Sequence, residues 1–153
     1  MTKLYLTLIA LFMLVSAQAQ TITEKDLLGK WIITSVGYDD NIIDMQTGEM
    51  VFTEQTIKEA KEEGMDREDL EAEFKNLEQS YKNITLVIDA GTMQMKIQDT
   101  VANSDTYKIE EKDGRQWIVG GNGARTEYTL KNNVLRLIMI RRDAVVHLYF
   151  KKE

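Results

Sequence analysis

The sequence contains no cysteine and no proline, and it has a single histidine among 153 residues. Without cysteine the chain has no disulfide bond, no thiolate metal ligand and no cysteine nucleophile. A lone histidine leaves the common acid–base and metal-site patterns without a second imidazole. The sequence also lacks a Gly-rich phosphate loop and a G-x-S-x-G nucleophile motif. We therefore expect a protein that is not an enzyme and that uses neither a cofactor nor a metal ion.

An excess of basic residues is also missing, because the net charge is −6. This balance argues against a nucleic-acid partner and against binding to an anionic membrane surface. The acidity is local: acids outnumber bases more than two to one in residues 21–82, whereas bases are slightly in excess in residues 83–153. The apolar fraction of 43% is ordinary for one packed domain.

The longest apolar run stands at the N-terminus. Residues 4–15 are almost entirely apolar, Lys3 precedes them, and the small residues of Ser16 to Ala19 follow as an A-x-A pattern. This arrangement predicts a secretory signal peptide over residues 1–19. The run is shorter than the roughly 20 apolar residues of a membrane span. We expect the mature domain, residues 20–153, to be periplasmic or secreted and to have no membrane span.

β-branched and aromatic residues dominate most of the mature chain. Residues 28–37 predict a first strand, and a weak second strand is expected at 42–44 or 50–52. Turn signals such as Asp113-Gly114 divide the later part of the chain into about seven more strands. Eight antiparallel strands with short connections favour a closed up-and-down barrel, with a two-sheet sandwich as the alternative. The later strands are expected at residues 84–89, 93–98, 106–111, 116–119, 126–130, 134–140 and 145–150.

A helical insertion is expected at about residues 53–82, between the first strand and the later ones. Thr53 can cap a first helix that Gly64 ends, and Asp66 can cap a second. We consider three roles for the insertion: a lid over the barrel mouth, an acidic docking surface for a basic protein partner, or a solvated helix face. The second helix carries an apolar stripe at the helical period, formed by Leu70, Phe74, Leu77 and Tyr81.

A short motif on the first strand resembles a known family. Gly29-x-Trp31 is similar to the G-x-W signature of lipocalins, and the five residues ending at Trp31 resemble the opening of short lipocalin-like domains exported by Bacteroidetes-type bacteria. The resemblance implies a calycin-type barrel in which the tryptophan closes the floor beneath a basic side chain. A cation over a large aromatic face is a favourable contact. Arg136 is our choice for that cation, with Arg141 and Lys151 as alternatives.

The inward-facing residues of the later strands are the candidate ligand site. They would hold a small apolar or amphipathic molecule, because ligand pockets are mostly apolar. The alternative is a barrel filled by its own side chains, since eight strands leave little space inside; the protein would then be a structural or interaction module of the cell envelope. A small hydrolase or isomerase that uses the barrel cavity is a third hypothesis. The candidate lining residues are Leu86, Ile88, Met93, Met95, Tyr107, Ile109, Trp117, Tyr128 and Leu137, together with Leu130 and Leu135.

The single histidine and one group of acidic residues are weaker candidates for a functional site. His147 lies between apolar strand residues and is expected to be a structural or surface histidine. Asp39, Asp40, Asp44 and Glu49 could supply oxygen ligands to a calcium ion, but their spacing does not match the EF-hand loop.

Overall fold

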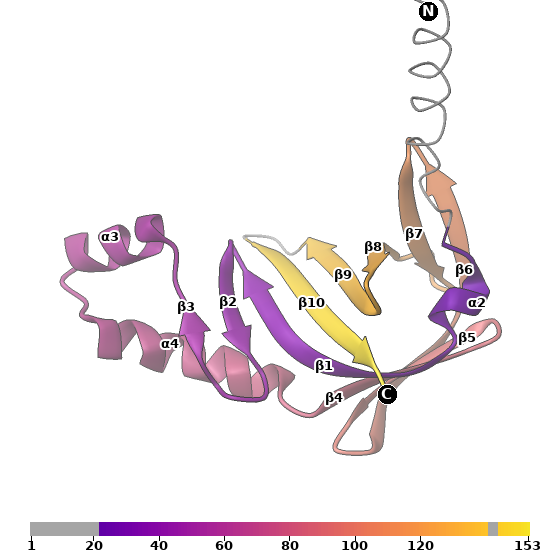
Figure 1. Ribbon diagram of the computed structural model, residues 1–153, viewed down its shortest axis with the longest axis horizontal. Helices are drawn as coiled ribbons and strands as arrows, with labels where there is room; N and C mark the ends of the chain where they lie inside the picture. Colours follow the sequence, from indigo (N-terminus) through magenta and orange to yellow (C-terminus); the bar gives the residue numbers. More distant parts are fainter. Residues whose placement is uncertain (1–21, 141–143) are drawn as a thin grey trace, which may run out of the picture.

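The computed structural model describes residues 22–140 and 144–153, and its main body is an antiparallel β-barrel (Figure 1). Each strand of the barrel is hydrogen-bonded to the next, and the last strand, β10, pairs back with β1. This closure confirms the predicted mainly-β, up-and-down barrel, whereas a two-sheet sandwich would leave open edges. The barrel strands are β1 (Gly29–Tyr38), β4 (Ile84–Asp89), β5 (Thr92–Ile97), β6 (Thr100–Lys112), β7 (Arg115–Gly120), β8 (Arg125–Lys131), β9 (Val134–Ile140) and β10 (Val145–Lys152).

Two predictions fall on residues that the structure does not describe. The expected signal peptide at residues 1–19 lies outside the described residues, and so does Arg141. In the part of the chain that is described, no helix is long and apolar enough to cross a membrane.

Tight turns set the up-and-down order of the strands. Asp113 and Gly114 connect β6 to β7 with φ values of 55° and 72°. Asn132 and Asn133 connect β8 to β9 with φ values of 53° and 60°. Two consecutive positive φ values are typical of the hairpin turns whose twist matches that of the strands. Glycine and asparagine tolerate this backbone conformation, which explains why these positions signal the hairpins.

β1 is shared between the barrel and a second, smaller part of the molecule. Its first half pairs with β4, and its second half pairs on the same edge with β2 (Asn41–Asp44), which pairs in turn with β3 (Met50–Val51). Helices α3 (Glu54–Glu62) and α4 (Arg67–Tyr81) follow. We call β2, β3, α3 and α4 the helical lobe; Figure 1 shows it extending beyond one end of the barrel.

The two helices begin where their capping residues predict. The Thr53 side chain accepts a hydrogen bond from the Thr56 amide at 3.1 Å. The Asp66 side chain accepts from the Asp69 amide at 3.0 Å, and the Asp69 carboxylate accepts from the Asp66 amide at 3.2 Å. These bonds satisfy amide groups that have no partner in the first turn of a helix. The predicted helical insertion is therefore confirmed.

The apolar stripe of α4 packs onto the lobe and the adjoining part of β1. The Phe74 ring meets Phe52 edge to face with centroids 5.1 Å apart, and it meets Tyr38 in the same way at 6.2 Å. Leu70 and Tyr81, at the two ends of the stripe, are buried. Tyr81 belongs to the same buried cluster as the barrel core, so the lobe and the barrel share one continuous core.

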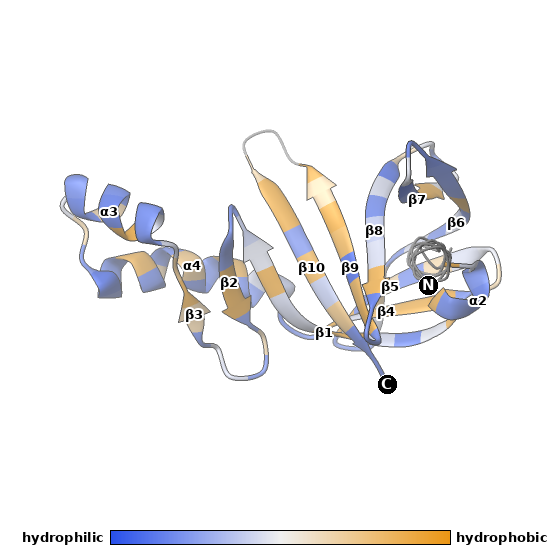
Figure 2. Cartoon of the chain, turned by 45° about the horizontal axis from the view of Figure 1, so that its top comes forward, coloured by the Kyte–Doolittle hydropathy of each residue, from blue (hydrophilic) through white to orange (hydrophobic). Residues whose placement is uncertain are grey.

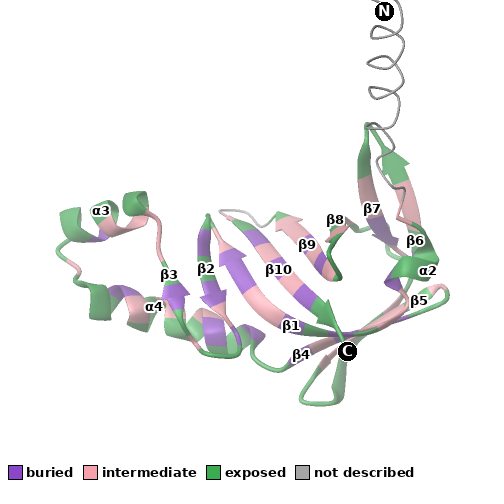
Figure 3. Ribbon diagram, in the orientation of Figure 1, coloured by how far each residue is buried: buried purple, intermediate pink, exposed green. Residues whose placement is uncertain are grey.

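Side chains alternate between the inside and the outside of the barrel, as Figure 2 shows by the alternating hydrophobic and hydrophilic bands. The buried positions concentrate on β1, β4 and β10 (Figure 3). A β-bulge between Ile33 and Ser35 shifts the register of β1, so Ile33 and Val36 both face the core although they are three residues apart. One row of cross-strand neighbours inside the barrel consists of Val36, Leu148, Leu137, Tyr128 and Gln116.

The next row of cross-strand neighbours lies on the outside. It begins at Gly37 on β1 and reaches Trp117 on β7, because every strand in between contributes one residue. This row fixes which residues can meet on the outer surface. Its members in order are Gly37, His147, Ile138, Glu127 and Trp117.

Candidate functional site

Eight of the nine candidate ligand residues lie in or against the barrel core. Leu86, Ile88 and Leu137 are buried members of the core cluster, as are the two tyrosines at positions 107 and 128. Three more side chains are partly buried and pack against the cluster. These are Met93, Met95 and Ile109.

The prediction that Trp117 lines the interior is wrong. Tyr128 is the cross-strand neighbour of Gln116, whereas Trp117 pairs with Glu127. Neighbouring positions on a strand point to opposite faces, so Trp117 lies on the outer surface when Tyr128 points inward. Trp117, Ile118 and Val119 are three consecutive apolar residues, and such a run carries no alternation from which to assign the faces.

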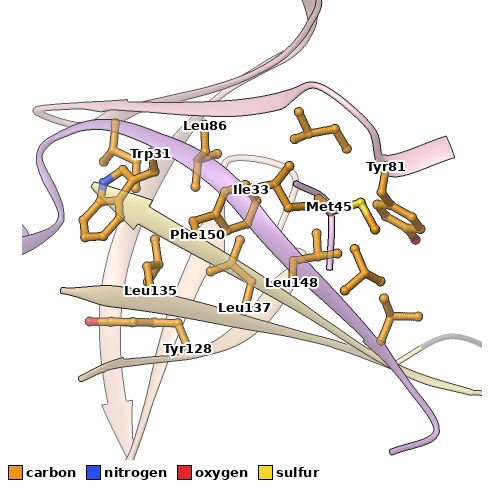
Figure 4. Close-up of a cluster of buried hydrophobic side chains, with 14 of the residues drawn as sticks. Trp31, Ile33, Met45, Tyr81, Leu86, Tyr128, Leu135, Leu137, Leu148 and Phe150 are labelled. Atoms are coloured by element: carbon orange, nitrogen blue, oxygen red, sulfur yellow. The ribbon is translucent and has the colours of Figure 1, made fainter. Parts of the chain in front are cut away.

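The barrel interior is filled by its own side chains. Figure 4 shows Leu135, Leu137 and Leu148 pointing into one common core with Phe150. Leu135, Leu148 and Phe150 have no exposed surface at all. Five pockets on the described residues are lined by the helical lobe and by outward-facing residues of the barrel, and not by these four side chains. The interior therefore resembles the close-packed core of a globular domain.

One end of the barrel is sealed by the segment that precedes β1. Helix α2 (Glu24–Leu27) buries Leu27 completely. The Trp31 indole donates a hydrogen bond to the Leu27 carbonyl at 2.7 Å. The Gln116 side-chain amide donates to the Ile22 carbonyl at 3.1 Å. These contacts attach the segment to strands on opposite sides of the barrel.

A lysine, and not an arginine, lies over the barrel-floor tryptophan. The Lys152 ammonium is 5.2 Å from the centre of the Trp31 ring. Arg136 instead lies over the Tyr149 ring at 5.8 Å. The prediction of Arg136 is wrong because its neighbour Leu135 faces the core and Arg136 must face outward. Lys152 stands two residues after the inward-facing Phe150, and residues two apart on a strand share a face. This spacing could have identified Lys152 as the basic side chain over Trp31.

Two buried tyrosine hydroxyls give the core an unusual polar character. Tyr107 and Tyr128 each bury their hydroxyl, and neither hydroxyl has a hydrogen-bond partner within the described residues. Burial raises the pKa of Tyr128 to about 12. Burial also raises the pKa of Tyr107, and the nearby carboxylate of Glu24 adds to this shift. Both phenols therefore stay neutral at physiological pH.

The helical lobe contains an apolar pocket. A cavity of about 380 Å³ opens between α3 and the start of α4, within the size range of small-molecule sites. Lys61 and Arg67 stand at its rim together with Asp66. The apolar lining consists of Phe52, Ile57, Ala60, Met65 and Leu70.

The sequence carried a weak signal for this cavity. Ile57 and Ala60 are three residues apart on α3 and therefore share one face of that helix. Met65 follows that helix closely, and Leu70 begins the stripe of α4. The position of these four side chains around a space depends on the angle between the helices, which spacing does not give.

A second depression of the lobe has an acidic rim. It has a volume of about 230 Å³, and the rings of Tyr38 and Phe74 form part of its lining. Glu59, Glu63 and Glu73 also line it. The local acidity noted in the sequence is therefore gathered around an apolar floor at this point.

The single histidine lies on the outer surface in contact with an arginine. The Arg136 guanidinium donates to His147 Nδ1 from Nε at 3.2 Å. This contact requires His147 Nδ1 to be an acceptor, as in the neutral imidazole. Burial and the adjacent Arg136 charge hold the pKa of His147 below its ordinary value. His147 thus has a structural partner, as the sequence led us to expect.

Two of the four candidate calcium ligands accept hydrogen bonds from backbone amides. Asp44 Oδ1 accepts hydrogen bonds from the amides of Gln46 and Thr47 at 2.8 and 2.9 Å. Asp39 Oδ1 accepts from the Val145 amide at 3.2 Å. Among the residues that the structure describes, no three His, Asp or Glu side chains are grouped so that they could hold a metal ion.

Comparison with protein-family models, with curated proteins and with solved structures finds no match to this chain.

Proposed function

We propose that the protein is a non-enzymatic, lipocalin-like binding protein for a small apolar or amphipathic molecule, and that the ligand occupies the cavity of the helical lobe. The observation that carries this proposal is the contrast between the two interiors. The barrel is packed and sealed, whereas the space between α3 and α4 is open and apolar. The closed eight-stranded barrel is compatible with the lipocalin-like family to which the Gly29-x-Trp31 motif points.

In this proposal the barrel is a scaffold and the helical insertion holds the ligand itself. The insertion then contacts the barrel core through α4, because Tyr81 belongs to the core cluster and Phe74 and Leu77 pack against it. Binding energy comes from covering the apolar lining of the cavity. Lys61, which has no ion-pair partner among the described residues, is positioned at the rim to contact a polar head group.

Filling the cavity tests the proposal. We expect the protein to enhance the fluorescence of the amphipathic probe 1-anilinonaphthalene-8-sulfonate in a saturable manner. Ala60 is buried in the cavity wall, so Ala60→Phe should abolish that signal. Ala72 is exposed on α4, so Ala72→Phe is the matched control and should leave the signal unchanged.

A third variant distinguishes the helical lobe from the barrel. Met95 packs against the barrel core, so Met95→Phe changes the barrel interior and leaves the lobe cavity intact. Probe binding that survives Ala60→Phe and is lost in Met95→Phe would assign the ligand to the barrel and refute the proposal. Urea unfolding of each variant establishes that it is folded.

A docking module is the second candidate function, and the acidic rim around Tyr38 and Phe74 favours it. A basic amphipathic Lys/Leu helix is the model partner, because its charge complements the rim. Its affinity should fall with added salt and with Glu73→Lys. Glu68→Lys makes the same change on the other side of α4 and should have no such effect. If the two variants weaken binding equally, the attraction is non-specific and the docking hypothesis is wrong.

The predicted signal peptide supports an exported location, periplasmic or secreted. N-terminal sequencing of the protein recovered from outside the cytoplasm should then begin at Gln20. Retention of the uncleaved chain in the cytoplasm would contradict this part of the proposal.

A further inference from the structure

Strand β7 lies far from the helical lobe (Figure 1) and carries a tryptophan on the outer face of the barrel. Trp117 stands on β7, with Glu110 of β6 and Glu127 of β8 as its two cross-strand neighbours. Arg115 and Arg125 stand beside it, and together with Trp117, Lys112 and Asp113 they line a hollow of about 430 Å³. The Trp117 ring is partly exposed on this surface. We call Trp117 and its four charged neighbours the Trp117 platform.

Two diagonal ion pairs frame the indole ring. The Arg125 guanidinium on β8 crosses β7 to donate to the Glu110 carboxylate at 2.8 Å. The Arg115 guanidinium on β7 donates to the Glu127 carboxylate at 3.4 Å. Each arginine is thus held beside Trp117 by a glutamate that is the direct neighbour of the indole. Cations and anions therefore alternate around one flat apolar surface.

This arrangement combines three properties that a ligand must match. The indole offers a broad apolar face, the guanidinium groups offer hydrogen-bond donors, and the carboxylates offer acceptors. Lys108 also pairs with Glu110 at 2.7 Å, and Lys112 and Asp113 complete the lining of the hollow, so cations and anions are mixed around the indole and most of them are ion-paired. A pyranose ring has the complementary chemistry, with an apolar C–H face surrounded by hydroxyl groups that both donate and accept.

We propose that the Trp117 platform is a saccharide-binding site, in which a pyranose ring stacks on Trp117 and its hydroxyls bond to the flanking arginines and glutamates. An apolar ligand would desolvate the charged groups without giving them partners, which is costly. A nucleic acid would require several unpaired cations, whereas Lys108, Arg115 and Arg125 are each paired with a glutamate. The platform is separate from the lobe cavity, so the two proposals stand or fall independently.

NMR spectroscopy can observe the platform directly, because the chain has two tryptophans and hence two indole N–H signals. The Trp31 indole is buried and bonded to Leu27, whereas Trp117 is at the surface. We would titrate the ¹⁵N-labelled protein with maltohexaose, cellohexaose, xylohexaose and chitohexaose in turn. At least one of these should shift the Trp117 signal in a saturable manner and leave the Trp31 signal in place.

Substitutions then test the stacking. Trp117→Ala should weaken binding by about tenfold or more, the usual size for truncating an aromatic anchor. Trp117→Tyr retains a flat ring and should recover most of the affinity. Tyr149→Ala is the control, because Tyr149 also lies on the outer face beside an arginine but outside the platform. The proposal is overturned if no oligosaccharide gives a saturable shift, or if Trp117→Ala binds as tightly as the unsubstituted protein.

Discussion

Lys152, the last residue of β10, holds its ammonium group 5.2 Å from the centre of the Trp31 ring on β1. The two residues are direct cross-strand partners in the pairing that closes the barrel. Lys152 also donates to the Asp26 carbonyl at 3.4 Å. The contact therefore joins the first strand, the last strand and the α2 segment at the sealed end.

The Lys152–Trp31 contact should have a modest effect on stability. We expect Lys152→Ala to lower the free energy of unfolding by about 0.5–1 kcal/mol, the range for an exposed cation–π contact. Urea unfolding followed by circular dichroism measures the change. Arg136→Ala removes a cation of the outer surface, so it should not shift the Trp31 indole N–H signal, whereas Lys152→Ala should. A shift of the Trp31 signal in Arg136→Ala but not in Lys152→Ala would show that Arg136 is the partner of Trp31.

Gly29 of the G-x-W motif should resist substitution. Its φ of +126° is a conformation that L side chains rarely adopt, and an added Cβ would lie 3.0 Å from Lys152 Cε. We expect Gly29→Ala to cost about 1–3 kcal/mol of stability. Gly123 has a φ of +83° with nothing within 4 Å of an added Cβ. Gly123→Ala should therefore cost less, and an equal cost in the two unfolding curves would contradict this explanation.

The Tyr128 hydroxyl should not stabilise the folded protein. It is buried without a hydrogen-bond partner in the described part of the chain, and removing an unsatisfied polar group relieves its desolvation cost. We expect Tyr128→Phe to be neutral or to stabilise the protein by up to about 1 kcal/mol. Tyr128→Leu, which also removes ring contacts, should destabilise it. A clear loss of stability in Tyr128→Phe would reveal a bound water or ligand at that hydroxyl.

His147 should make stability depend on pH in the mildly acidic range. Its pKa in the folded protein lies below the ordinary value of 6.5, so the unfolded chain binds the proton more readily. Stability should therefore fall as pH drops through about 6.5, and it should level off below the folded-state pKa. His147→Gln keeps an acceptor for Arg136 and removes this dependence. Urea unfolding midpoints at pH 7.5, 6.5 and 5.5 provide the measurement, and parallel profiles for the two proteins would exclude His147 as the cause.

The local structure could be predicted because each signal depends on neighbouring residues. The capping residues Thr53 and Asp66 locate the helix starts, and Asp113-Gly114 locates a hairpin, since φ preferences and nearby hydrogen bonds are local properties. Strict alternation, as in the strand around Met95, likewise assigned inward and outward faces correctly.

The tertiary structure alone decided how those elements meet. Trp117 is in a run of apolar residues, so its face follows from its pairing with Glu127 and not from its own sequence. The bulge after Ile33 changes the face of every later residue of β1, and no local pattern announces it. Lys152 reaches Trp31 because barrel closure joins residues from the two ends of the chain. The sequence by itself thus determined most of the strands and turns, the helices and the acidic character of the insertion, but it missed the first half of β6 (Thr100–Lys112) and expected only one of β2 and β3. Closure, register and helix packing decided that the barrel is filled, that the apolar cavity lies in the helical lobe, and that Trp117 faces outward, because these depend on contacts between residues that are distant in the sequence.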